Sequence, residues 1–235
     1  GTYQDVEYPR DTFAKLTAPF GHVHVKVNEN NTLRIETPGL FFPGKVLAQE
    51  LVPVEPLLFK QADSDGYSAF AEDEQGKITY LFNPISTKIG AFEKVSPSST
   101  VVFQLWMLGI SVLIFFSAVL AGLYCVIKGK LSLTSGLAFA VSLLYIIFLV
   151  GFGLAFWLIA PWKLAYGKPA IIQALLFIPP IAAILSLGLP FHTFKVWSSK
   201  NWSTLGKLHY TLTTITTLFF ISILVHWNLL SPISF

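Results

Sequence analysis

Apolar and polar residues alternate through much of the first 95 positions. The clearest example is the segment HVHVKVNENNTLRIE. Its apolar positions are Val23, Val25, Val27, Leu33 and Ile35, and its polar positions are His22, His24, Lys26, Arg34 and Glu36. A period of two residues predicts strands with one buried and one solvated face. The run Asn28-Glu29-Asn30-Asn31 predicts the turn between them.

Further strand patterns follow along the chain. In YSAFAEDEQGKITYLF, residues Glu72–Lys77 are expected to turn the chain, with Gly76 available for positive φ. We expect VEPLLFK and AFEKV to add strands, and DTFAKLTAPFG to form a short helix or helical turn. No long helix separates the strands, which argues against a Rossmann unit. The prediction for residues 1–97 is a small antiparallel all-β domain, a barrel or a sandwich.

Long apolar stretches replace the alternation after residue 97. They cover about residues 101–127, 131–160, 170–189 and 208–229, and about 20 apolar residues suffice to cross the hydrocarbon of a bilayer. We therefore predict that residues 98–235 form an all-α bundle of four transmembrane helices. The first two stretches exceed the necessary length, so tilting or protrusion is expected. Pro179-Pro180 should kink the third helix, because proline cannot donate to the helix ladder.

Charge divides the chain at the same place. All 13 acidic residues lie between Asp5 and Glu93 with nine of the 16 Lys and Arg, whereas residues 96–235 hold seven Lys, no Arg and no acid. The whole chain is 12% charged, about half the usual share in soluble domains. The net charge of +3 reflects lysines beside apolar runs, so nucleic acid is not an expected partner. The single Cys125 can form no intrachain disulfide.

Lysines predict the orientation of the bundle. The connections 128–130 and 191–207 hold five lysines and should lie on one side, whereas the connection 161–169 holds two. The positive-inside rule then predicts an integral protein of the cell membrane with loops 128–130 and 191–207 in the cytoplasm. The N-terminal β-domain and the C-terminus would face outside. Six tryptophans suit the two interfaces, namely Trp106, Trp157, Trp162 and Trp227 outside and Trp197 and Trp202 inside.

The membrane half offers little chemistry. No Asp or Glu occurs in any predicted span, which argues against a carboxylate proton relay or cation site. Small-xxx-small pairs such as Ala118/Gly122 and Gly136/Ala140, and a threonine-rich last span, are ordinary devices of helix packing in lipid. An anchor or scaffold is the expected role. His192 and His209 could form a haem pair near one membrane edge, but interfacial histidines are the simpler interpretation.

The β-domain holds a few weak candidate sites. Asp63-Ser64-Asp65-Gly66 resembles the start of a calcium loop, but the later ligands are missing, so a hairpin turn is favoured. His22 and His24 are a possible metal pair without an identifiable third ligand. Asn30-Asn31-Thr32 is a glycosylation sequon that matters only in a glycosylating host. We assign no catalytic, metal-binding or cofactor-binding residue and expect no cofactor.

One resemblance covers essentially the whole chain. The string GTYQ…YPRDTFAKLTAPFGHVHVKVNENNTLRIE…LVPVEPLLFKQADSDGYSAFAEDEQGKITYLF…FEKV, followed by membrane helices, resembles the C-terminal region of membrane-anchored serine hydrolases of the β-lactamase/penicillin-binding-protein-like family. The resemblance implies an extracytoplasmic catalytic domain, then a small lipocalin-like β-domain, then transmembrane helices. It implies as partners the lipid bilayer and an N-terminal hydrolase domain of the same parent protein.

The catalytic motifs of that family are missing. The family acts through Ser-x-x-Lys, Tyr-x-Asn and Lys/His-x-Gly, and the chain contains neither of the first two. Lys88-Ile89-Gly90 matches only the third. Because a serine needs a base within hydrogen-bond reach, we expect the chain alone to be catalytically silent and to act as the anchoring module of a serine hydrolase.

Two other interpretations stay open. The chain could be a stand-alone membrane receptor or partner subunit whose β-domain binds a ligand, or a b-type haem electron-transfer subunit. An outward-facing domain before the first span needs an export signal upstream, which we expect to be either a catalytic domain with its own signal peptide or a signal peptide alone.

Overall fold

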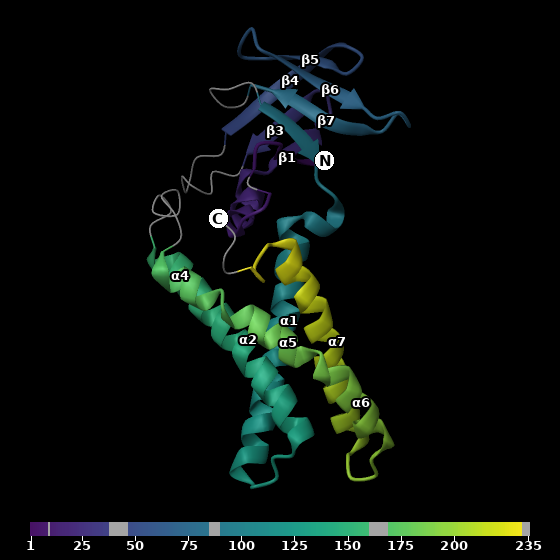
Figure 1. Ribbon diagram of the computed structural model, residues 1–235. Coiled ribbons are helices and arrows are strands. Elements are labelled where there is room, and N and C mark those ends of the chain that lie inside the picture. The colour runs from purple at the N-terminus through teal and green to yellow at the C-terminus, as the bar shows by residue number, and fades with distance from the viewer. Residues whose placement is uncertain (9, 38–46, 85–89, 160–168, 232–235) are drawn as a thin grey trace. The chain divides into compact units, whose positions relative to one another are not determined.

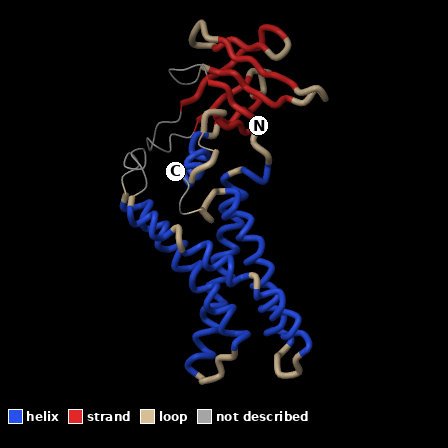
Figure 2. Tube along the Cα trace, viewed as in Figure 1, coloured by secondary structure: helices blue, strands red, loops and turns tan. Residues whose placement is uncertain are grey.

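The computed structural model describes residues 1–8, 10–37, 47–84, 90–159 and 169–231. The chain divides into two compact units, the first made of Gly1–Arg10 with Ala14–Gln104 and the second of Leu105–Phe235 with Asp11–Phe13. Figure 2 shows that strands are confined to the first unit and long helices to the second. Each unit is therefore described by itself.

The first unit contains a closed antiparallel barrel (Figure 1). Its strands are β1 Thr2–Asp5, β2 Val23–Val27, β3 Leu33–Thr37, β4 Leu47–Glu55, β5 Leu58–Gln61, β6 Tyr67–Glu72, β7 Ile78–Asn83 and β8 Gly90–Lys94. Each strand pairs with its neighbour in sequence order, and β1 closes the barrel by pairing with β8, Gln4 opposite Glu93. This confirms the predicted all-β class and decides for a barrel, with the strand number and order that lipocalins use. Closure also removes the sheet edges that could pair with other chains.

Apolar side chains from most strands of the barrel form a buried cluster in its interior. The buried cluster consists of Tyr3, Val23, Val25, Ile35, Leu51, Phe70, Leu81 and Phe92. The ring of Phe70 makes edge-to-face contacts with two other rings. Its centroid lies 6.0 Å from that of Tyr3 and 5.5 Å from that of Phe59. Such T-shaped contacts are favourable for aromatic pairs. The interior of an eight-stranded barrel is narrow, so side chains such as these can occupy much of it.

The predicted turns at Asn31 and Gly76 are present, and one further turn divides the segment VEPLLFK. Gly76 has φ of 75° in the turn between β6 and β7, as its position predicted. Asn31 adopts φ of 60° in the turn between β2 and β3, a region that asparagine tolerates better than most residues. VEPLLFK contributes to two strands, because Pro56 and Leu57 form a turn between β4 and β5. Leu57 adopts φ of 63° there and its side chain packs against the core.

The segment expected to be a short helix is a 3-10 helix, η1, over Phe13–Gly21. It leads directly into β2, and the backbone N–H of His22 donates to the Pro19 carbonyl at 3.4 Å. His22 is consequently only 1% exposed, so its predicted place on a wet face is wrong. Val27 was predicted on the apolar face of the strand, but it is 71% exposed at the end of β2.

The second unit holds four apolar segments able to cross a membrane. They are α1 Val101–Ile127, α2 Leu133–Leu158, the broken helix α4 Ala170–Leu175, α5 Ile178–Ser186 and α6 Gly188–Ser198, and finally α7 Thr204–His226. The first segment has the predicted bounds. The second begins at Leu133 rather than at 131, and the last begins and ends earlier than predicted. The predicted connection 191–207 is wrong, because helix continues to Ser198 and resumes at Thr204.

Prolines explain the breaks in the third span. The predicted interruption at Pro179-Pro180 is confirmed, since α4 ends at Leu175 and α5 begins at Ile178. A proline leaves the carbonyl four residues before it without its helical partner, and these carbonyls belong to Leu175 and Leu176. Pro190 likewise leaves the Ser186 carbonyl without its helical partner, and α5 ends at Ser186. The second break was not predicted.

Aromatic side chains form the centre of the bundle. Phe115 of α1, Tyr145 of α2 and Phe220 of α7 are at most 1% exposed, and their ring centroids lie 5.0–5.4 Å apart. Gly122 of α1 makes room for the Phe139 side chain of α2, because a Cβ atom there would lie 2.3 Å from Cδ2 of Phe139. The small residue predicted from the Ala118/Gly122 pair thus serves helix packing.

Candidate functional site

The outer face of the barrel carries a row of apolar side chains across four strands. Leu58 of β5 lies opposite Ala69 of β6, Ala69 opposite Phe82 of β7, and Phe82 opposite Ala91 of β8. We call these residues the outer row. Phe82 is 41% exposed, and its ring stacks on that of the exposed Tyr80 with centroids 6.5 Å apart. Exposed aromatic side chains of this kind are common in protein interfaces, so the outer row is a candidate binding surface.

A buried polar pair lies inside the barrel. The Asn83 amide donates to Ser68 Oγ at 2.7 Å, and Asn83 Oδ1 has no hydrogen-bond partner among the described residues. A buried amide oxygen needs a partner, which one water can supply. Beside this pair, the barrel interior holds the apolar cluster described above.

The two β-domain histidines have separate polar partners. His22 Nε2 lies 3.2 Å from Gln4 Oε1, and His24 Nδ1 lies 3.1 Å from Thr2 Oγ1. Burial lowers the pKa of His22 to about 4, with a smaller effect of the neighbouring His24. Burial also lowers the pKa of His24. Among the described residues no third His, Cys, Asp or Glu joins them, so the metal pair stays incomplete.

The candidate calcium loop is a hairpin turn between β5 and β6. Ser64 Oγ accepts from the Gly66 N–H at 3.3 Å and donates to Gln61 Oε1. Asp65 accepts from Lys60 Nζ at 3.1 Å. These contacts are those of a stable turn, and the described residues contain no group of three or more metal-ligating side chains.

The sequon lies in the turn between β2 and β3. The Thr32 hydroxyl lies 2.7 Å from both Asn30 Oδ1 and Glu50 Oε1, and the hydrogen bond from Thr32 is the main cause that lowers the pKa of Glu50. Both sequon side chains thus take part in the turn itself. Residues 88 and 89 of Lys88-Ile89-Gly90 lie outside the described residues.

Two of the three histidines in the helical unit, His192 and His209, each pair with a hydroxyl on another helix. His192 Nδ1 of α6 lies 2.9 Å from Thr134 Oγ1 of α2. His209 Nε2 of α7 lies 2.9 Å from Ser117 Oγ of α1. Each imidazole therefore links a different pair of helices, as interhelical hydrogen bonds do in membrane proteins.

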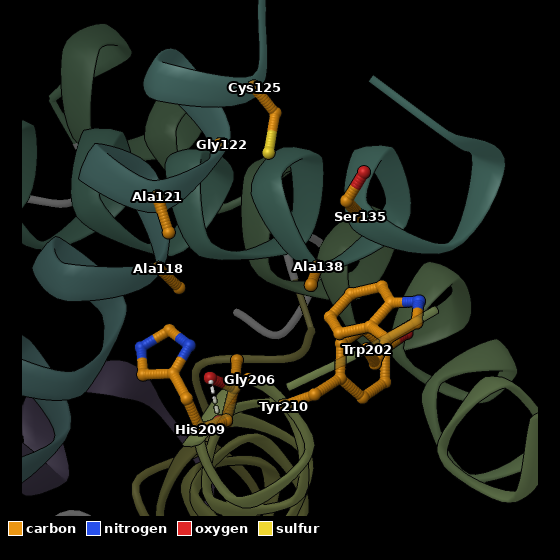
Figure 3. A pocket seen from close by; sticks show the side chains of 11 residues that line it. Ala118, Ala121, Gly122, Cys125, Ser135, Ala138, Trp202, Gly206, His209 and Tyr210 are labelled. Carbon is orange, nitrogen blue, oxygen red and sulfur yellow. Dashed lines mark hydrogen bonds between the residues drawn. The ribbon is translucent and has the colours of Figure 1, made fainter. Parts of the chain in front are cut away.

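A cavity of about 130 Å³ lies between α1, α2 and α7. Figure 3 shows its walls, which are built largely from small residues such as Ala118, Ala121, Gly122 and Ala138, with His209 and Tyr210 contributed by α7. Trp202, from the connection before α7, meets the Tyr210 ring edge-on with centroids 5.8 Å apart. The small residues leave the space that larger side chains would fill.

Tyr210 is the unusual member of this cavity. It is 3% exposed, and its hydroxyl has no hydrogen-bond partner among the described residues. A buried hydroxyl without a partner is unfavourable. Sequence reasoning singled out Ala118, Gly122 and His209 for other reasons but missed the cavity, because only the packing of three helices brings these residues together.

No protein-family model, curated protein or solved structure matches this chain.

Proposed function

We propose that the chain is the membrane-anchoring accessory module of a serine hydrolase of the β-lactamase-related kind. The barrel binds the catalytic domain through its outer face, and the four helices hold the pair at the extracytoplasmic surface of the cell membrane. The chain itself performs no hydrolysis. The observation that carries the proposal is the outer row, Leu58–Ala69–Phe82–Ala91, on a barrel whose interior holds a cluster of apolar side chains.

The apolar cluster inside the barrel favours binding on the outside. Lipocalin-type barrels that carry a small ligand need space within the sheet, whereas eight side chains of this barrel pack into one buried cluster. The exposed Phe82 and Tyr80 are the kind of aromatic residue that dominates protein interfaces. A protein domain is therefore a better partner for this barrel than a small molecule.

The bundle suits an anchor because it lacks charged groups that transport would use. No acidic residue follows Glu93 in the sequence, and intramembrane carboxylates are the usual mark of ion or proton pathways. The membrane histidines described above are engaged with hydroxyls of neighbouring helices.

Activity-based labelling tests the proposal. The coding sequence upstream of Gly1 is determined in the native transcript, and native membranes are treated with a fluorophosphonate or β-lactam probe before isolation with an antibody to the barrel. We expect the labelled serine to lie outside residues 1–235, in the same polypeptide or in a tightly bound one. The purified chain 1–235 should stay unlabelled. Labelling within it, or the absence of any hydrolase from the isolated complex, would reject the proposal.

The outer row is tested by a matched pair of variants. Phe82→Glu should weaken retention of the hydrolase domain, because it places a charge at the centre of the apolar row. Tyr67→Glu serves as control, since Tyr67 is also exposed on the barrel but lies opposite Lys60. Both variants are checked by circular dichroism. Equal retention in both would show that the hydrolase does not bind through this row, and capture of an unrelated extracytoplasmic protein would favour a receptor instead.

A further inference from the structure

We propose that the cavity between α1, α2 and α7 binds an anionic phospholipid of the membrane. Part of one acyl chain fills the apolar cavity, an ester carbonyl accepts a hydrogen bond from the Tyr210 hydroxyl, and Lys128 and Lys130 attract the headgroup. This inference concerns the bundle alone and does not depend on the role of the barrel.

The walls of the cavity favour a hydrocarbon occupant. Alanine and glycine residues of α1 and α2 form much of the lining, and apolar cavities of about 150 Å³ stay dry and accept apolar ligands. A volume of about 130 Å³ has room for a few methylene groups but not for a whole lipid. Ala121 is exposed on α1, where a helix of a membrane bundle meets lipid, so a chain can enter from that side.

The Tyr210 hydroxyl supplies the polar contact that such an occupant needs. It is buried and has no acceptor among the described residues. Tyr210 is the seventh residue of α7, about 9 Å along the helix from its first residue. That depth is close to the boundary between hydrocarbon and headgroups, where lipid ester groups lie. An ester carbonyl is an acceptor that carries its own apolar chain.

The same end of the bundle is positively charged. Cys125 of α1 lines the cavity, and its carbonyl accepts from the backbone N–H of Lys130 at 2.9 Å. The turn that holds Lys128 and Lys130 therefore begins at the cavity wall. Both lysines are exposed, and no acidic residue follows Glu93 in the chain to neutralise them. Lysines beside helix ends attract anionic headgroups.

Native mass spectrometry of the full chain in a mild detergent tests the site. The probes are phosphatidylglycerol and phosphatidylcholine with the same acyl chains. We expect one phosphatidylglycerol to bind more tightly than the rest and more tightly than phosphatidylcholine. Inorganic phosphate should not compete, because it lacks the chain that fills the cavity. Preference for neither lipid, or displacement by phosphate alone, would overturn the proposal.

Matched variants locate the binding. Tyr210→Phe should weaken the tightest site about fivefold, the value of one net hydrogen bond, whereas Tyr124→Phe, on the exposed face of α1, should leave it unchanged. Ala121→Phe should block entry of the chain, while Leu123→Phe, also exposed on α1, should not. Replacing Lys128 and Lys130 by Gln should remove the preference for phosphatidylglycerol.

Two results would overturn the assignment. One is unchanged lipid binding in both Tyr210→Phe and Ala121→Phe. The other is a lipid-free dimer in which a second copy of the chain occupies the cavity and is broken by Ala121→Phe. If Ala121→Phe does not fold, the comparison of Tyr210→Phe with Tyr124→Phe decides alone, because neither change adds volume.

Discussion

His22 Nε2 lies 3.2 Å from Gln4 Oε1, and this pair links the entry to β2 with the neighbouring strand β1. The imidazole is 1% exposed. Burial is the main reason why the pKa of His22 falls to about 4, well below its ordinary value of 6.5. At neutral pH the folded barrel therefore contains a neutral imidazole, whereas the unfolded chain holds a group that protonates more readily.

This difference predicts acid sensitivity of the barrel. Between pH 6.5 and pH 4 the unfolded state binds more protons at His22 than the folded state, so stability is complete above the unfolded pKa and falls as pH falls toward the folded pKa. The effect of this one group is about 3 kcal/mol across that range. We expect the urea midpoint of fragment 1–97, which contains the whole barrel, to fall between pH 7 and pH 4.5.

A variant separates His22 from the acidic residues. His22→Gln keeps an amide that can pair with Gln4 but does not titrate, so its midpoint should depend less on pH than that of the wild type. The pKa of Glu36, lowered mainly by its hydrogen bond from Lys26, changes stability in the same direction in both proteins. An identical pH dependence in the two proteins would assign the acid sensitivity to the carboxylates.

Two valines of one strand predict unequal costs for the same substitution. Val25 and Val27 have the same place in the alternating pattern, yet Val25 belongs to the core and Val27 is 71% exposed. Val25→Asp should lower the free energy of unfolding by about 3 kcal/mol or more, because it buries a charge without a partner. Val27→Asp should change it by less than about 0.5 kcal/mol. Urea unfolding of fragment 1–97 measures both, and equal effects would contradict the burial of Val25 and the exposure of Val27.

The barrel illustrates how far the pattern of residues reaches. Alternation in residues 23–27 and 33–35 is a local property, so it predicted the strands and the inward faces of Val23, Val25 and Ile35. Closure depends on the pairing of Gln4 with Glu93, residues at opposite ends of the domain that no local pattern connects. The burial of His22 likewise depends on how η1 leads into β2, and the alternation of residues along a strand carries no information on that.

The helical unit shows the same division. Length and hydropathy predicted its spans, and the ring chemistry of proline predicted the break before Pro179. The extension of the third helix to Ser198 was missed, because Lys195 and the polar residues around it resemble a connection. The cavity at Tyr210 was missed for a stronger reason. It arises from side chains on three helices, and their packing, rather than any one segment, leaves the hydroxyl without a partner.

The lysine distribution predicts a definite topology. In a Cys125→Ala background, a cysteine at Leu131, in the connection between α1 and α2, should resist a membrane-impermeant thiol reagent in intact cells. A cysteine at Glu74, in the exposed turn between β6 and β7, should react. Neither position changes a lysine on which the positive-inside rule depends. The opposite labelling pattern, with Leu131→Cys modified and Glu74→Cys protected, would reverse the orientation.

Two glycines of α1 provide a final test of the bundle. At Gly122 an added Cβ would lie 2.3–2.6 Å from the Cδ2, Cγ and Cβ atoms of Phe139, whereas at Gly109 nothing lies within 4 Å. Gly122→Ala should destabilise the bundle by about 1–3 kcal/mol, because overpacking forces the two helices apart or Phe139 into a poor rotamer. Gly109→Ala should be neutral or slightly stabilising, because alanine is the better helix former.

Tryptophan fluorescence during unfolding by sodium dodecyl sulfate in mixed micelles measures both glycine variants. The clash also predicts that the two positions are coupled. Phe139→Leu should recover part of the stability lost in Gly122→Ala but should lower stability in the wild-type background. That coupling is expected only when the two side chains are in contact. If the two glycine variants are equally stable, or if Phe139→Leu destabilises both backgrounds to the same extent, then α1 and α2 do not pack through Gly122.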